Sequence, residues 1–104
     1  MNFAEAFPDL SAELQQLLAR KGERVLADSV STLQIADRCR CGDDFCASIY
    51  TKPKPAGRYG PTHKNIDLEP DKGMIILDVV DGRIHQIEIL YRDEIRNRLH
   101  ILLP

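Results

Sequence analysis

The sequence predicts one α+β domain over residues 1–104, with about four antiparallel strands in two hairpins, two N-terminal helices and one short C-terminal helix. Two observations predict this class. Leucines recur at helical spacing near the N-terminus, whereas later segments alternate apolar and polar residues around turn signals. The length of 104 residues suits a single hydrophobic core. Strands with one apolar face need a cover, so we expect the helices to pack on that face.

The first helix is predicted over residues 8–22, PDLSAELQQLLARKG, with Asp9 as its N-terminal cap. Gly22 supplies the left-handed residue that ends it. A second, shorter helix is predicted over residues 23–31, leading into a strand. The first helix presents one apolar stripe, formed by Leu10, Leu14, Leu17 and Leu18.

Two hairpins follow. Residues 33–41 and 45–51 form the first, with the cysteine-bearing face of 33–41 turned inward. Residues 72–80 and 82–91 form the second around Asp81-Gly82, the strongest turn signal in the chain. A three-residue loop ending at Gly82 would align the apolar positions of both strands, His85 included, on one face. Between the hairpins, residues 52–65 read as an exposed loop, and a last helix follows, capped by Asp93.

Two motifs resemble known sequences. The segment GMIILDVVDGRIHQIEIL resembles a strand pair of small bacterial domains of unknown function, in which a G-x-I-x-x-I-E-I-L strand follows a turn. The C-x-C-G strand end after a short helix is similar to a group of small uncharacterised bacterial proteins. The resemblance implies a fold of the predicted class and brings no established activity with it.

All three cysteines lie within the eight residues CRCGDDFC. A structural zinc site needs four ligands, and Cys39, Cys41 and Cys46 supply three, with His63 of the following loop as the fourth. Two other roles stay open. Free cysteines often act as small buried hydrophobes, and Cys41 with Cys46 is the most comfortable pair for a disulfide. Zinc is therefore a possible cofactor, and no other cofactor is indicated.

The register of the cysteine hairpin decides between these roles. A loop over residues 42–45 sets Cys41 opposite Cys46 and brings the three thiols to one face. A loop over residues 42–44 instead groups Phe45 with Cys39 and Cys41 and turns Cys46 away. The second register buries more apolar surface, since Phe45 contributes about 2 kcal/mol when buried. Without metal, we expect the second register.

Charge is unevenly distributed along the chain. The net charge is −2, but residues 51–64 carry four basic residues and no acid. Lys52, Lys54 and Arg58 are therefore candidates for contact with an acidic partner. On the second hairpin, the strand face opposite the core should carry Ile76, Ile84 and Glu88, a half-apolar surface suited to a partner or a second subunit.

Composition narrows the function classes. No apolar run approaches the roughly 20 residues of a membrane span, and the mild acidity makes nucleic acid an unlikely partner. No phosphate loop, nucleophile elbow or paired acid and base is specified, so we expect no enzyme. The N-terminus lacks a signal-like pattern, which favours a cytoplasmic protein. The sequence therefore predicts a non-enzymatic interaction or dimerisation module, with a structural zinc module as the alternative.

Overall fold

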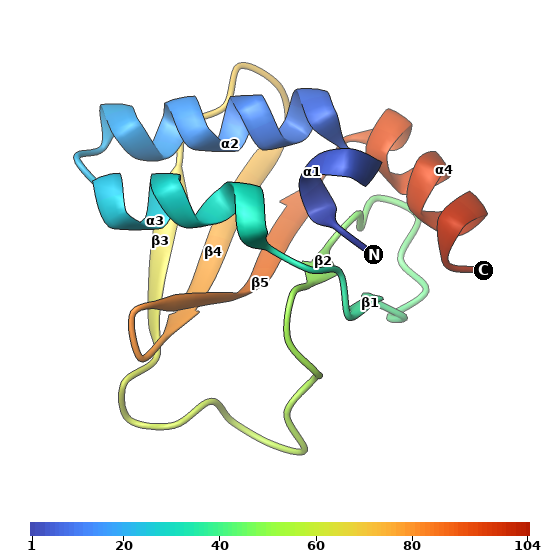
Figure 1. The fold of residues 1–104 in the computed structure, drawn as a ribbon. Coiled ribbons are helices and arrows are strands. Elements are labelled where there is room, and N and C mark those ends of the chain that lie inside the picture. The colour runs from blue at the N-terminus through green and yellow to red at the C-terminus, as the bar shows by residue number, and fades with distance from the viewer.

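The computed structural model describes residues 1–104 as a five-stranded antiparallel sheet with helices packed on one face (Figure 1). This confirms the α+β class and adds a fifth strand to the four expected. The elements in chain order are α1 (Phe3–Ala6), α2 (Pro8–Arg20), α3 (Arg24–Ser29), a 3-10 turn (Val30–Thr32), β1 (Asp37–Arg38), β2 (Ile49–Tyr50), β3 (Lys64–Leu68), β4 (Met74–Val80), β5 (Arg83–Leu90) and α4 (Asp93–Leu102).

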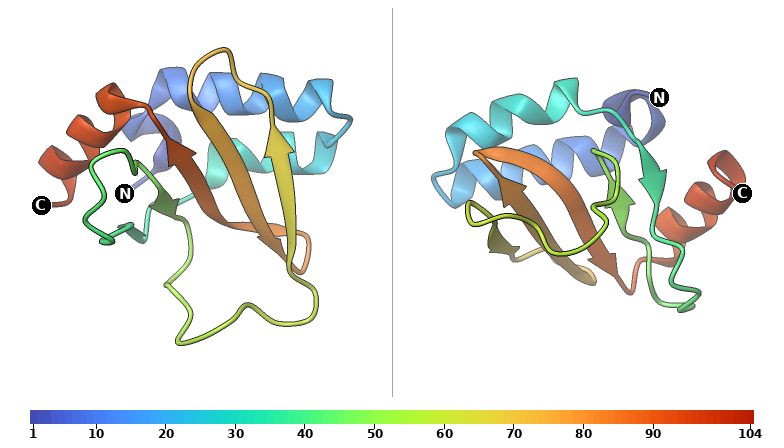
Figure 2. Two further views of the ribbon diagram at one scale, coloured as in Figure 1. Left: turned by 180° about the vertical axis from the view of Figure 1, so that it is seen from behind. Right: turned by 90° about the horizontal axis from the view of Figure 1, so that it is seen from below.

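The strands lie in the order β1-β2-β5-β4-β3, so β1 and β3 are the two edges. Figure 2 shows α2 and α3 lying across one face of the sheet, with α4 beside its end. The opposite face carries no helix, and we call it the outer face. The core lies between the helices and the inner face, and 23 buried apolar residues build it.

The N-terminal helices follow the leucine pattern closely. All four stripe leucines of α2 are buried, and Gly22 has the left-handed φ of 80° that ends the helix. The helix begins at Pro8, where the predicted segment began, but its cap was predicted two residues late. Pro8 opens α2 and Phe7 is its N-cap residue, so Asp9 lies in the first turn, where its charge suits the helix dipole. The short helix α1 was not expected; the side chain of Asn2 caps it by accepting from the Glu5 N–H at 2.9 Å.

Strand β3 is the element missing from the prediction. Ile66 and Leu68 alternate with exposed residues along Lys64–Leu68, and both are buried. The strand begins where the proline-rich loop was expected to end, and three residues before it the chain still contains Pro61. This pattern has only two apolar positions, too few to distinguish a short edge strand from loop.

The β4–β5 turn differs from the predicted loop. Val80 pairs with Arg83 across a two-residue turn, in which Asp81 and Gly82 have φ of 52° and 74°. The extra residue is His85, because Val79 pairs with Ile84 while Asp78 pairs with Gln86. The apolar pairing of β4 with β5 is thus restored by a bulge inside β5. As a consequence Ile84 lies in the core, only 1% exposed, and its predicted place on the outer face is wrong.

The cysteine hairpin adopts the register that was not expected without metal. Asp37 pairs with Tyr50, and the Cys39 N–H donates to the Ser48 carbonyl at 2.9 Å. The same spacing sets Cys41 opposite Cys46 with a loop over residues 42–45. The predicted inward face of the cysteines is therefore also wrong: Ala47 and Ile49 point into the core, while the cysteines lie on the outer face.

The physical reason lies outside the hairpin. Strand β2 also pairs with β5, and Ile49 lies opposite the fully buried Ile87. This pairing turns Ile49 and Ala47 inward, and the register of β1 against β2 then sets Cys39 opposite Ser48, on the other face. Phe45 falls in the 42–45 loop, beyond the strand that its apolar neighbours form. Phe45 stays 38% exposed and stacks on Tyr91 with ring centroids 5.4 Å apart.

The C-terminal helix α4 closes one end of the core. Ile95 and Leu99 are buried, but the predicted cap is wrong: α4 has no side-chain cap, and Asp93 is its first residue. Ahead of it, Arg92 forms a two-pronged ion pair with Glu13 of α2, at 2.9 and 3.0 Å. None of the helices has the length and apolar character needed to cross a membrane.

Candidate metal centre

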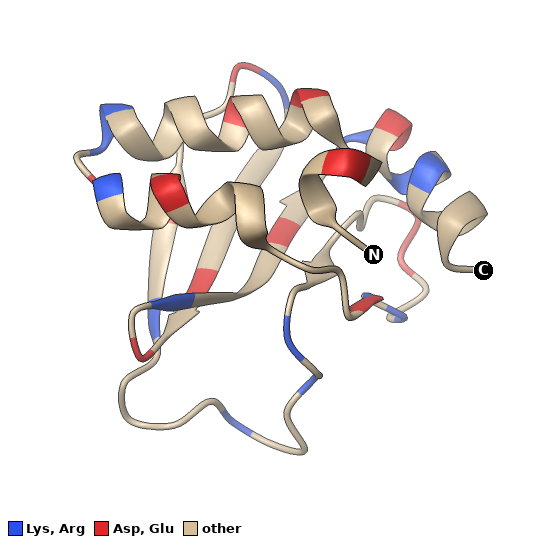
Figure 3. Ribbon diagram, viewed as in Figure 1, with Lys and Arg blue, Asp and Glu red and all other residues tan.

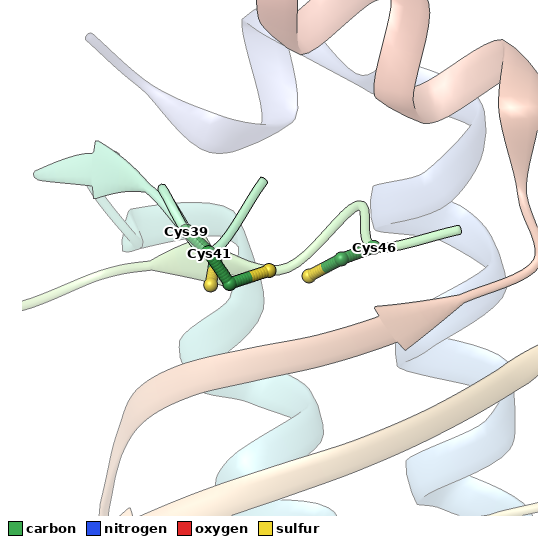
Figure 4. A group of neighbouring side chains, drawn as sticks. All are labelled: Cys39, Cys41 and Cys46. Atoms are coloured by element: carbon green, nitrogen blue, oxygen red, sulfur yellow. The ribbon is translucent and has the colours of Figure 1, made fainter. Parts of the chain in front are cut away.

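Three thiols meet at the β1 edge of the sheet. The sulfur atoms of Cys39, Cys41 and Cys46 all lie within 4.8 Å of one another. Figure 4 shows the three side chains coming from two adjacent segments of the chain, with their sulfur atoms gathered together. We call these residues the cysteine cluster. None of the three forms a disulfide.

The hairpin register explains why the thiols converge. Side chains two residues apart point to the same face of an extended chain, which aligns Cys39 with Cys41. The 42–45 loop then returns Cys46 to that face, and Gly42 permits the turn with a φ of 84°. Cys41 is exposed, whereas Cys39 and Cys46 are half-buried. The cluster is thus accessible from solvent and held by backbone on two sides.

The thiols differ in their acidity. Burial raises the pKa of Cys39 to about 11; the Cys41 N–H opposes this rise, and the thiols of Cys41 and Cys46 add to it. Cys46 is also desolvated, yet its pKa is lowered because the hydroxyl and N–H of Ser48, together with the other two thiols, stabilise the thiolate. The Cys46 sulfur lies 3.4 Å from the Ser48 hydroxyl oxygen. Cys46 is therefore the thiol best prepared to act as a ligand.

His63 does not join the cysteine cluster. It precedes β3, at the opposite edge of the sheet from β1, and its Nε2 lies 2.7 Å from Oδ1 of Asp78. The same oxygen accepts from the Asn65 amide at 2.7 Å. The fourth ligand expected from the sequence is thus committed to a different set of side chains.

Asp78 is the centre of this second set. It is only 4% exposed, and its other oxygen, Oδ2, is buried without a donor. Glu88 of the neighbouring strand faces it. Hydrogen bonding to Asp78 raises the pKa of Glu88 to about 7, with burial and the Asp78 charge adding to the rise. When Glu88 is protonated, its O–H can donate to the carboxylate of Asp78. We call Asp78, Glu88, His63 and Asn65 the carboxyl cluster.

Residues 51–63, which we call the basic loop, connect β2 to β3. Figure 3 shows basic positions and no acidic position along this loop, and Lys52, Lys54 and Arg58 are all exposed. Tyr59 attaches the loop to the sheet, since its ring lies 4.8 Å from that of His63 and its hydroxyl is 3.4 Å from Oε1 of Gln86. Burial raises the pKa of Tyr59 to about 12, and the Asp78 charge contributes.

The candidate site residues predicted from the sequence therefore lie in separate parts of the structure. It brings the three cysteines together, leaves the three basic residues on the loop, and keeps Ile76 and Glu88 half-buried on the outer face. It adds Asp78, Asn65 and Ser48, which sequence reasoning did not select. Of these three, only Asp78 could have been recognised from the sequence, because it is the single charged residue within the apolar strand MIILDVV.

Comparison with known proteins yields no match: neither the protein-family models, nor the curated proteins, nor the solved structures contain a match to this chain.

Proposed function

We propose that this protein is a non-enzymatic, thiolate metal-binding module in which Cys39, Cys41 and Cys46 hold one zinc ion at the edge of the sheet. The observation that carries the proposal is the convergence of three sulfur atoms within 4.8 Å. Thiolates are the ligands that zinc prefers in structural sites. A reducing cytoplasmic compartment would keep the thiols available for the metal.

The spacing supports the chemistry. With Zn–S bonds of about 2.3 Å, two sulfurs of a tetrahedral site lie about 3.8 Å apart. The cluster therefore needs to contract by no more than about 1 Å, which rotation of the three side chains supplies. Binding would also tie β1 to the segment after the 42–45 loop. Because β1 has only two paired residues, a metal bound at this edge would stabilise the pairing of β1 with β2.

The proposal is tested by measuring the zinc content of the protein and then the loss of zinc in single cysteine variants. Protein purified without chelator is expected to carry one zinc per chain in native mass spectrometry, with all three thiols protected from alkylation. Cys41→Ser, Cys46→Ser and Cys39→Ser should each abolish tight binding, whereas His63→Gln should leave it intact. Zinc retained by Cys46→Ser would defeat the proposal, as would three reactive thiols in zinc-saturated protein.

A second candidate, an interaction or dimerisation module, is supported by exposed apolar side chains near the cysteine cluster. Phe45, Met74 and Tyr91 are 38%, 45% and 58% exposed. Phe45 directly precedes Cys46, and Met74 pairs with Leu90 on the neighbouring strand. Large exposed apolar side chains that adjoin one another are typical of contact surfaces.

Sedimentation velocity tests this second candidate. A concentration-dependent shift to a larger species in the native chain, abolished by Phe45→Ser with Tyr91→Ser, is the expected result for a dimer. A chain that stays monomeric at high concentration would exclude the dimer. The basic loop offers a separate surface for an acidic partner, whose binding should then weaken with salt and with Lys52→Glu and Lys54→Glu.

A further inference from the structure

We propose that the cysteine cluster is a three-coordinate site, and that its preferred occupant is a thiophilic ion of the trivalent arsenic class, taken up as arsenite, over tetrahedral zinc. This inference rests on the proposed function in using the same three thiols as metal ligands. It goes further by naming the geometry of the ion, which the number of available donors decides.

The first step is the donor count. Zinc sites hold four ligands, and a site with three protein ligands leaves the fourth position to water or another molecule. No carboxylate or imidazole joins the three sulfur atoms of the cysteine cluster. The chain therefore offers a complete ligand set for a three-coordinate ion and an incomplete one for zinc.

The second step is that the neighbouring donors are engaged elsewhere. Both oxygens of Asp37 accept from Arg40, at 3.0 and 3.1 Å. The Ser48 hydroxyl oxygen accepts the Ile89 N–H at 3.0 Å. His63 is held by Asp78 across the sheet. Recruiting any of them as a fourth ligand would break a hydrogen bond that the folded chain already makes.

The third step is the chemistry of the ion. Trivalent arsenic carries a lone pair that occupies the fourth direction, so it needs three ligands arranged as a pyramid. Each cysteine S–H replaces one hydroxyl group of arsenous acid: three As–S bonds form, three As–O bonds break, and three water molecules leave. No oxidation state changes. Cys41 is exposed, so the ion can attach there first and then close onto Cys46 and Cys39.

The arrangement of the three thiols on the hairpin also suits the lone pair of trivalent arsenic. The three donors come from two adjacent segments of one hairpin, as Figure 4 shows, and the exposed Cys41 marks the side of the cluster that is open to solvent. A tetrahedral ion bound this way would need an additional donor on the side away from the hairpin. A pyramidal ion would not.

The experiment titrates the reduced chain of residues 1–104 with arsenite and, separately, with zinc, and then lets the two compete at equal concentration. Native mass spectrometry reports the bound ion, and alkylation reports how many thiols it protects. We expect one arsenic per chain, three protected thiols, and arsenic retained when zinc is added. Cys41→Ser should lower arsenite affinity by more than the roughly 10 to 100-fold caused by losing a group that only orients a ligand.

Two controls show whether a loss of ion binding comes from the missing thiol and not from a change in the fold or the loop. Cys41→Ser changes an exposed side chain, so circular dichroism should show an unaltered fold; Asp44→Asn, in the same loop, should bind both ions as the native chain does. If zinc binds through three thiols and displaces arsenic, this inference is wrong and the proposed function stands. If neither ion binds, both are wrong. Arsenic protecting only two thiols would also overturn the three-coordinate site.

Discussion

The outer face of the sheet carries two clusters that differ in how far the folded chain satisfies them. In the carboxyl cluster the buried Asp78 accepts from His63 and Asn65, and Glu88, whose pKa is raised to about 7, can donate to it when protonated. The cysteine cluster is accessible, and its sulfur atoms face one another with the Ser48 hydroxyl beside Cys46. One cluster uses its polar groups to hold the fold, and the other leaves its ligands available.

The difference follows from position in the sheet. Asp78 lies on β4, between β5 and β3, so donors reach it from both sides. The cysteines lie at the β1 edge, where one side of the strand has no partner. Side chains at an edge meet fewer competing groups, which leaves them open to a ligand from solution. We therefore assign stability to the carboxyl cluster and ligand binding to the cysteine cluster, and four predictions test this division.

The largest effect is expected from Asp78→Ala. The substitution removes the acceptor of two hydrogen bonds, and we expect it to lower the free energy of unfolding by about 3 kcal/mol in urea denaturation. Asp67→Ala, at an exposed position of β3, is the matched control and should change it by less than about 0.5 kcal/mol. A loss below about 1 kcal/mol for Asp78→Ala would remove the structural role of the carboxyl cluster.

Zinc should produce the next largest effect, and only through the cysteines. At a free zinc concentration about 100 times the dissociation constant, the free energy of unfolding should rise by about 2.7 kcal/mol, and chelator should reverse the gain. Urea denaturation with and without zinc measures it. The gain should vanish in Cys46→Ser and persist in His63→Gln. If the gain in the free energy of unfolding also required His63, the cysteine cluster and the carboxyl cluster would act together, and our separation of them would be wrong.

Glu88 should give the protein a pH dependence of smaller size. Its folded-state pKa of about 7 lies above the ordinary value of 4.5, so the folded chain binds the extra proton. Stability from this group is fully present below pH 4.5 and is lost as the pH rises to about 7. Because the carboxyl is partly open to solvent, we expect about 1 kcal/mol.

Denaturation at several pH values checks this effect, and Glu88→Gln is the matched variant. The amide of Gln can donate to Asp78 at every pH, so the slope between pH 4.5 and 7 should flatten. An unchanged slope in Glu88→Gln would mean that another group is responsible.

The smallest effect is expected on the basic loop. Lys52 and Lys54 are exposed and touch neither cluster, so Lys52→Glu with Lys54→Glu should change the free energy of unfolding by less than about 0.5 kcal/mol. Zinc binding should stay the same. A substantial loss of stability would show that the loop supports the carboxyl cluster through its charge, and not only through Tyr59.

Local signals predicted much of the secondary structure. The leucine stripe of α2, the stop at Gly22 and the turn at Asp81-Gly82 each depend on residues close in sequence, and each is present. Strand β3 was missed because two apolar positions are too few for a pattern. The bulge at His85 was placed in the turn instead, because periodicity shows that one extra residue is needed without showing where it lies.

The candidate site was predicted only in part. The clustering of three cysteines is visible in CRCGDDFC, but the fourth ligand was assigned to His63 because sequence proximity was the only guide. Asp78 captures that histidine across the sheet. This contact joins residues 15 positions apart. It depends on the pairing of β3 with β4, and β3 was absent from the prediction.

By itself, the sequence determined the fold class, the main helices and the presence of a thiol-rich hairpin, because these depend on short-range periodicity and turn residues. Only the tertiary structure decided which way the cysteines point. The pairing of β2 with β5 puts Ile49 into the core opposite Ile87, and the pairing of β1 with β2 then places Cys39 opposite Ser48, on the outer face. These pairings join residues far apart in the sequence, so a local pattern could not reveal the register that they set.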